Sequence, residues 1–328
     1  MNDPSQQHIG TPALIRRFAP YLMRYKRILI FDLFCAALTT LCDIVLPKIM
    51  SYLTNAATDP GIVLTVDAVL KLALLYLILR LIDGAAQYFM SGTGHIMGVY
   101  IETDMRRDAF AHLQRLSHTY YSNTKVGQIM GRITNDLFDV TEFAHHCPEE
   151  FFIAGIKIAA SFIILCWASV PLTLVVFACV PLMAVVSIKL NLKLRAAFRR
   201  QRFQIGELNA SIEDSLLGQR VVKAFAAEEE ENKKFEQGNT AFQTIKKKTY
   251  HAMAAFNTST RLFDGLMYLV VIVAGGLSLV YGTISAGDLV AYVLYVSTLI
   301  ATIRRIVEFA EQFQRGVTGI ERFFDIID

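Results

Sequence analysis

The stretch LTLVVFACVPLMAVVSIKL, residues 172–190, is followed without a break by NLKLRAAFRRQR, residues 191–202. The first part is apolar over a length that crosses the hydrocarbon core of a bilayer, which takes about 20 helical residues. The second part is densely basic, and basic residues beside a span stay in the cytoplasm. No proline follows Pro181, so one helix is free to continue through both parts. The stretch predicts a membrane span that extends into the cytosol.

Five other apolar runs of similar length surround this one and are also predicted to be spans. They are residues 28–46, 66–82, 152–170, 262–281 and 289–303. Of the 328 residues, 54% are hydrophobic and 19% are charged, whereas soluble domains carry about a quarter charged residues. The five cysteines are dispersed, mostly inside apolar runs, which is typical of packed residues rather than of disulfides. We predict an all-α membrane protein with six long transmembrane helices.

Lysine and arginine are distributed on one side of these spans. The connections at residues 51–65, 169–171 and 282–288 contain neither residue, whereas the chain ends and the loops 84–150 and 193–261 are basic. Because positive charge is retained in the cytoplasm, both termini and both long loops are predicted to be cytoplasmic. We expect a multi-pass protein of the plasma membrane, the inner membrane of a bacterium, with the lipid bilayer as a partner. The net charge of only +3 argues against a nucleic-acid partner.

The two long internal loops are predicted to be helical rather than to be soluble domains. Apolar residues recur at helical spacing in each, namely Met105, Ala109, Leu113 and Leu116, and then Ile205, Leu208, Ile212 and Leu216. A helix from Val66 to Leu116 would be about 75 Å long, against about 30 Å for the bilayer core. The helices are expected to turn at residues 117–127 and 217–225. The acidic run 228–231 is expected to begin the second returning helix.

Both predicted turns carry recognisable sequences. The first reads YYSNTKVG, residues 120–127, followed by RITND at 132–136, and the second reads GQRVVKAF, residues 218–225. In this order, between six spans, they resemble the transmembrane domain of exporter-type (type 1) ABC transporters. Ser122 and Gln219 depart from the acidic and aliphatic residues usual in that family. The resemblance implies a six-span fold with two coupling-helix turns, and a homodimer or heterodimer in which spans four and five cross to the second half.

The resemblance also implies that both turns contact a nucleotide-binding domain, either fused to this chain or separate. Apolar anchors would be Tyr120, Tyr121, Val221, Val222 and Phe225, with Arg220 and Lys223 as charges at the rim. Ser122, Asn123, Gly127 and Gly218 complete the expected coupling set. The alternative is that these are ordinary loop and capping residues.

No phosphate-binding loop of the form Gly-x-x-x-x-Gly-Lys-Ser/Thr occurs in the sequence, and no Ser-Gly-Gly signature segment does. We therefore expect no catalytic site and no cofactor in this chain, with ATP and magnesium bound by the nucleotide-binding domain. The expected function is the permease domain of an ATP-driven exporter. The alternatives are a non-transporting scaffold or regulatory subunit of the same fold and, less favoured, a secondary transporter.

Three regions are expected along the chain. Residues 1–27 form a cytosolic tail and an interfacial elbow helix, whose apolar face consists of Leu14, Ile15, Phe18, Leu22 and Tyr25. Residues 28–315 form the six-span domain. Residues 316–328 resemble the start of a linker to a nucleotide-binding domain.

Four charged residues lie inside predicted spans. Asp32, Arg80 and Asp83 are at similar depth, which favours a charge cluster that pins the helices, with a substrate contact as the alternative. Lys157 is close enough to the interface to extend its amine to water, or alternatively faces a cavity and favours anionic cargo.

Histidines and carboxylates gather before the third span. His145, His146 and Cys147 stand beside Glu142, Glu149 and Glu150. Adjacent histidines point to different helix faces, and metal ligands usually repeat every three or four residues, so no metal site is predicted. The spacing of Gly94 and Gly98 indicates close helix packing.

Overall fold

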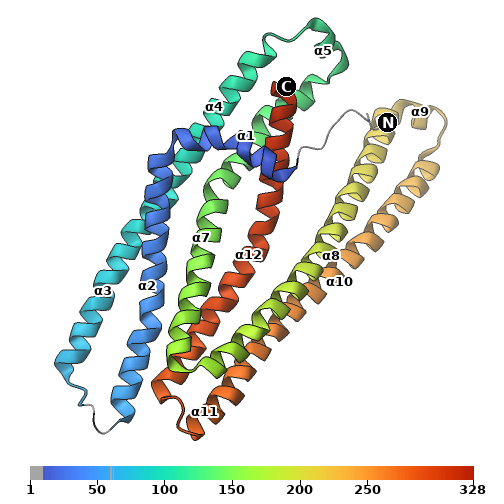
Figure 1. Ribbon diagram of the computed structural model, residues 1–328. Coiled ribbons are helices and arrows are strands. Elements are labelled where there is room, and N and C mark those ends of the chain that lie inside the picture. The colour runs from blue at the N-terminus through green and yellow to red at the C-terminus, as the bar shows by residue number, and fades with distance from the viewer. Residues whose placement is uncertain (1–9, 60, 62) are drawn as a thin grey trace. The chain divides into compact units, whose positions relative to one another are not determined.

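A computed structural model describes residues 10–59, 61 and 63–328 (Figure 1). Every regular element among these residues is a helix, which confirms the predicted all-α fold. The chain divides into two units. The first contains residues up to Leu174 together with Val271–Asp328, and the second is Val175–Val270.

The first unit contains most of the helices, including three π-helical segments labelled η. Its elements are α1 (Thr11–Arg24), α2 (Lys26–Thr58), α3 (Val66–Phe89), η1 (Met90–Gly94), α4 (His95–Leu113), α5 (His118–Asn123), α6 (Val126–Gly131), η2 (Arg132–Asp136), α7 (Leu137–Ala168), η3 (Val271–Gly275), α11 (Gly276–Val280) and α12 (Ala286–Ile327). The continuous helix predicted from Val66 is confirmed as far as Leu113, because α3, η1 and α4 follow one another without interruption.

The core of the first unit lies around the paired helices α7 and α12, which run side by side (Figure 1). One continuous apolar cluster joins α1, α2, α4, α7 and α12. Its most buried members include Met97, Ile101, Met105, Leu137, Val140 and Ile320. Burial of each such side chain contributes about 1.5–3 kcal/mol. This cluster fixes the helix ends from which the first turn projects.

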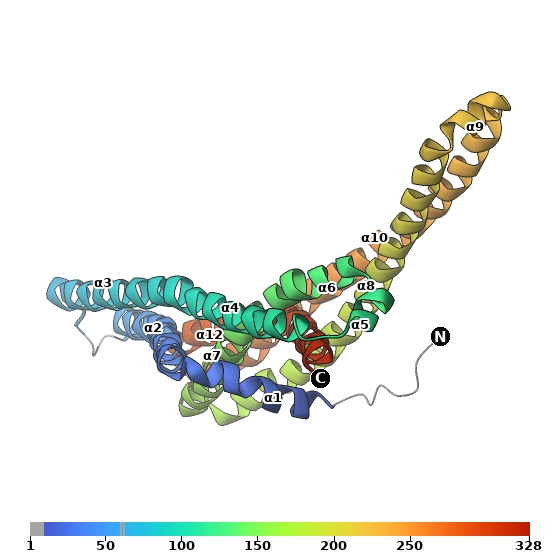
Figure 2. The ribbon, with the colours of Figure 1, turned by 90° about the horizontal axis from the view of Figure 1, so that it is seen from above.

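Helix α1 runs across this core beside the C-terminal end of α12 (Figure 2). Its apolar face was predicted to enter the membrane interface, but Leu14 and Phe18 are buried against the protein's own core. The hydroxyl groups of Tyr21 and Tyr25 donate hydrogen bonds to Asp108 (2.8 Å) and Asp104 (3.0 Å) of α4. An amphipathic pattern predicts only that one face of the helix is shielded from water. Here the protein's own core covers that face.

The opposite end of α12 is tied to α2 and α7 by hydrogen bonds. The Tyr295 hydroxyl donates to the carbonyl of Ile44 (2.8 Å), and the Tyr292 hydroxyl contacts the carbonyls of Leu165 (3.0 Å) and Ser169 (2.9 Å). Helix α12 begins with a capping box in which Ser285 and Asp288 satisfy each other's backbone amides. The capping box satisfies backbone amides at the start of α12 and so fixes where the helix begins.

Close packing of α12 on α7 gives a stability prediction. A Cβ at Gly316 would lie 2.6 Å from Cγ of Phe143, too close for either helix to accommodate without moving. We expect Gly316→Ala to lower the stability of the chain by about 1–3 kcal/mol, the usual cost of overpacking. The matched control is Gly155→Ala on α7, where a Cβ meets no atom within 4 Å.

Thermal unfolding in detergent would measure both variants. Gly155→Ala should be neutral or stabilising, since alanine favours helix by up to about 1 kcal/mol over glycine. Equal unfolding temperatures for Gly316→Ala and the parent chain would contradict the packing described for α7 and α12.

The second unit is a helical hairpin formed by α8 (Val170–Leu217) from Val175 onward, α9 (Gln219–Ala224) and α10 (Glu228–Val270). The Thr249 hydroxyl donates to the carbonyl of Ala197 (3.3 Å), and Leu208 packs against Gly238, so the long helices run together. As predicted, α10 begins with the acidic residues 228–231. The predicted second turn is confirmed by α9, which lies between the two long helices.

Among the described residues, five helical stretches are long and apolar enough to cross a membrane, by length and composition. They are Lys26–Thr58, Val126–Ala168, Val170–Leu217, Glu228–Val280 and Ala286–Ile327. The second predicted span lies in α3, whose sequence also carries Asp67, Lys71, Arg80 and Asp83, so the count of six stays a prediction. Large apolar side chains on α3, such as Leu70 and Leu81, are exposed, as expected of a surface that faces lipid.

Candidate functional site

The first predicted coupling turn is built from α5 and the start of α6. The Tyr121 hydroxyl donates a hydrogen bond to the carbonyl of Leu113 at the end of α4 (2.6 Å), while 37% of the Tyr121 side chain remains exposed. Tyr120 was predicted to be an apolar anchor as well. In the structure it is half-buried and packs against the cluster of Leu113, Ile129 and Ile326 in its own chain. Tyr121 is therefore the aromatic residue that the first turn offers to a partner.

The remaining residues of the first turn are less constrained. The Ser122 hydroxyl donates to the carbonyl of His118 (3.2 Å), so it stabilises α5 locally. Asn123 ends α5, and its side chain lies outside the part of the chain that the structure describes. A Cβ at Gly127 would meet no atom within 4 Å. Packing inside this chain does not require glycine at 127, and the space above it is open.

The second turn carries a larger exposed apolar surface. Phe225 and Leu217 are 79% and 80% exposed, and Val221 and Leu216 are exposed beside them. We call these four residues the apolar tip. Val222 is half-buried and Arg220 is exposed, whereas the backbone of Asp214 crowds Gly218. Soluble surfaces seldom leave such a group of large apolar side chains uncovered without a binding role.

The ends of α9 fix the apolar tip in place. Ala226, just after α9, has a φ of 49°, and its neighbour Ala227 donates a backbone hydrogen bond to the carbonyl of Val222 (2.9 Å). The Lys223 amine donates to Glu228 (2.7 Å), and this hydrogen bond lowers the pKa of the Glu228 carboxyl. Left-handed backbone is costly for alanine and occurs where surrounding structure holds it. The turn is therefore shaped before any partner arrives.

Two members of the apolar tip escaped prediction from sequence. Leu216 was counted as the end of the apolar stripe of the second internal loop, and Leu217 was named only as the first residue of the second turn, not as an anchor. Burial along α8 decreases from Leu208 to Leu216, although the start of α10 still contacts this part of α8 through Asp214 and Ser215. The signal in the sequence was that two large apolar residues stand directly before Gly218, where the helix turns.

A cavity of about 630 Å³ lies within the first unit, between α2, α3, α7 and α12. Its lining is unusually charged for a membrane helix bundle. Four carboxylates and three cations face it, namely Asp43, Asp83, Glu149, Glu150, Arg80, Lys157 and Arg305. Charged groups at membrane depth are costly and occur mainly where they line a cavity or pathway. We call this the charged cavity.

Ion pairs connect the helices across the charged cavity. Arg80 of α3 lies 2.8 Å from Asp83 and 3.4 Å from Asp43 of α2. Lys157 of α7 lies 3.0 Å from the same Asp43, and Arg305 of α12 donates to Glu150 of α7 (2.8 Å). Asp43 therefore joins three helices, because its carboxylate is shared between two cations.

These contacts revise the predicted charge cluster. Arg80 and Asp83 are paired, but Asp32 takes no part: it is buried beside His145, and the carboxylate that joins the cluster is Asp43. Lys157 faces the cavity rather than extending to the interface, and Asp43 compensates its charge. The suggested preference for anionic cargo therefore loses its main support. The sequence reasoning missed Asp43, which lies three turns beyond Asp32 on the same helix face.

The family model described as the ABC transporter transmembrane region matches residues 29–303. An uncharacterised ABC transporter ATP-binding protein of Bacillus subtilis (strain 168), YwjA, is 30% identical over 318 residues, which cover 96% of this chain and 54% of the relative. A putative multidrug export ATP-binding/permease protein of the same organism, YgaD, is 22% identical over 96% of this chain and 55% of its own length.

A third relative is the ATP-dependent lipid A-core flippase of Chromobacterium violaceum, which is 24% identical over 96% of this chain and 54% of the flippase. The chain thus spans about half the length of the curated relatives it matches. The family match includes both turns and every charged residue of the cavity except Arg305. Because that match covers most of the chain, the protein belongs to the family of ABC transporter transmembrane regions.

Proposed function

We propose that this chain forms half of the translocation pathway of an ATP-driven exporter, and that ATPase domains dock on its two cytosolic turns. The energy would come from those domains, which bind ATP and magnesium. The chain would convert their closure and separation into movement of its long helices. The relatives described as ATP-binding or permease proteins support a partner of this kind, either fused to the chain or separate.

The apolar tip is the observation that carries this proposal. It stands at the end of a hairpin whose helices continue for many turns beyond their apolar segments, so lipid does not account for its exposure. Burying four large apolar side chains would provide a strong anchor for a docked domain. Because α8 and α10 are continuous helices, a force applied at the tip is transmitted along them toward the membrane.

The charged cavity supports the part of the proposal that concerns the translocation pathway. Its ion pairs link four helices, and breaking and remaking such pairs allows a bundle to adopt more than one arrangement. The second half of the pathway would be another transmembrane domain, as a homodimer or heterodimer. We place the complex in the plasma membrane, the inner membrane of a bacterium, with both termini in the cytoplasm.

Cysteine labelling in intact cells tests the orientation that this proposal requires. Single cysteines at Ser122 and Glu229, in the two turns, should resist a membrane-impermeant reagent, because the turns must face the ATPase domains. A cysteine at Gly61, between α2 and α3, should react. Labelling after permeabilisation provides the control for reactivity at each position. Strong labelling of the Glu229 position in intact cells would place the turns outside and overturn the proposal.

A further inference from the structure

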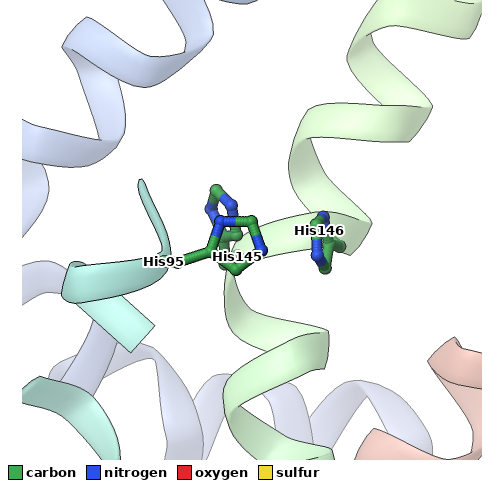
Figure 3. A group of neighbouring side chains, drawn as sticks. All are labelled: His95, His145 and His146. Atoms are coloured by element: carbon green, nitrogen blue, oxygen red, sulfur yellow. The ribbon is translucent and has the colours of Figure 1, made fainter. Parts of the chain in front are cut away.

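Three histidine side chains meet where α4 begins beside α7 (Figure 3). His95 comes from the first turn of α4, and His145 and His146 come from α7. The ring centroids lie 4.6 Å apart for His95 and His145, 4.8 Å for His95 and His146, and 4.6 Å for His145 and His146. One ring nitrogen from each lies within 4.8 Å of the others.

His95 explains how adjacent histidines can act together. Neighbouring residues on a helix point about 100° apart, which is why the sequence argued against a metal site. The structure places the His95 ring against both other rings, so the third ligand comes from a separate helix. No spacing along α7 alone could reveal this arrangement.

One of the three histidines, His145, and the neighbouring Asp32 are buried without hydrogen bonds. Asp32 is 0% exposed and His145 is 2% exposed, and none of their side-chain oxygen or nitrogen atoms has a hydrogen-bond partner among the described residues. The closest approaches are 3.7 Å from His145 Nδ1 to Asp32 and 3.6 Å from His145 Nε2 to Glu149, both too long for hydrogen bonds. Buried polar groups without partners are costly, so a ligand that bonded to these atoms would be stabilised here.

The absence of a side chain at Gly94 leaves space for the Asp32 carboxylate and the His145 ring. Gly94 ends the π-helical segment η1, and a Cβ there would lie 2.7 Å from Asp32 Oδ1 and would overlap the His145 ring. Any other residue at 94 would therefore displace both groups. π-Helical segments inside α-helices are found frequently at functional sites.

We propose that His95, His145 and His146 bind one divalent transition-metal ion of the zinc class. Imidazole nitrogen suits zinc, copper and nickel, whereas magnesium and calcium select oxygen ligands. Zinc–nitrogen bonds of about 2.0–2.1 Å place ligand nitrogens about 3.4 Å apart, so binding requires the rings to rotate toward one another. Three imidazoles leave a fourth coordination position open.

Carboxylates lie beside two of the three proposed histidine ligands. A histidine that binds metal usually donates its other ring N–H to a carboxylate, which orients the ring. Asp32 faces one nitrogen of His145 and Glu149 faces the other, so a carboxylate is available whichever nitrogen binds the ion. Glu142 lies 3.5 Å from Nε2 of His146, which leaves the Nδ1 of that ring for the metal.

The proposed ion would link α4 to α7 at the edge of the charged cavity, which Glu149 also lines. It would therefore restrain the relative movement of the two helices next to the pathway. This inference concerns metal binding alone and does not depend on the docking of ATPase domains.

Metal titration of the whole purified chain tests the proposal. After removal of metals with a chelator, calorimetry with zinc and absorption spectra with cobalt should show one site per chain, with a cobalt spectrum typical of nitrogen ligands. His95→Asn and His145→Gln should each weaken zinc binding by more than the roughly 10- to 100-fold that loss of an outer-shell partner costs. Glu149→Gln should fall within that smaller range. His251→Gln, an exposed histidine on α10, is the matched control and should bind as the parent does.

Zinc-dependent thermal unfolding separates loss of the site from loss of the fold. His95 is exposed, so His95→Asn should fold like the parent and lose only its stabilisation by zinc. Absence of saturable binding at one equivalent would overturn the proposal. So would unchanged zinc affinity in both His95→Asn and His145→Gln.

Discussion

Replacing Phe225 by alanine is expected to suppress ATP-driven transport while leaving the helices folded. Phe225 is 79% exposed at the apolar tip, so its removal takes away little packing within the chain. In a docked complex it would be a buried aromatic anchor, whose truncation typically costs about 2 kcal/mol or more. That cost corresponds to roughly 30-fold weaker docking of the ATPase domain. Transport and ATPase activity in vesicles, with thermal unfolding as the stability control, would measure the effect.

Two other variants define how specific this effect is. Phe203→Ala also removes an exposed phenylalanine side chain, but from a part of α8 far from the turn, so it should leave docking unchanged. Lys223→Ala should have a smaller effect than Phe225→Ala, because Lys223 is engaged with Glu228 and rim charges are screened.

The first turn allows the aromatic ring and the hydroxyl to be tested separately. Tyr121→Ala should impair docking as Phe225→Ala does, whereas Tyr121→Phe keeps the exposed ring and loses only the bond to Leu113. Full transport in both Phe225→Ala and Tyr121→Ala would remove the two turns from the mechanism.

Neutralising Asp43 is expected to produce the largest change at the charged cavity. Asp43→Asn leaves Lys157 without its 3.0 Å carboxylate and weakens the link between α2, α3 and α7. Hydrogen bonds to charged groups contribute about 1.5–3 kcal/mol each, and the half-exposed position of Asp43 favours the lower part of that range. We expect both lower thermal stability in detergent and slower transport.

A double-mutant cycle would isolate the Asp43–Lys157 interaction. Asp43→Asn, Lys157→Met and the double variant should show a coupling free energy within the range of about 0.5–3 kcal/mol found for interacting neighbours. The matched control is the exposed pair of Asp67 and Lys71 on α3, where coupling should be only about 0.3–0.5 kcal/mol. Strict additivity at Asp43 and Lys157 would contradict the ion pair and its place in the cavity.

The long helices and their turns could be predicted because they depend on local pattern. Apolar spacing, the absence of proline after Pro181 and the acidic run 228–231 determine where a helix continues and where it begins. The structure confirms these features in α4, α9 and α10. Each of them is a property of one helix read along its own sequence.

The features that escaped prediction depend on which helices face one another. Asp43 became important only because Arg80 and Lys157 approach it from two other helices, and His95 only because α4 meets α7. Likewise, the apolar face of α1 and the ring of Tyr120 were expected at interfaces but pack within the chain. A hydrophobic pattern identifies a face that leaves water without identifying what covers it.

Transport in sealed vesicles tests the central claim most directly, with this chain alone compared with the chain joined to a nucleotide-binding domain. A fluorescent phospholipid analogue and a cationic dye would serve as probes of cargo movement. The account predicts that the chain alone neither binds ATP nor moves a probe, and that movement requires both ATP and the joined domain. Movement of a probe by the chain alone, driven by an ion gradient without ATP, would contradict it.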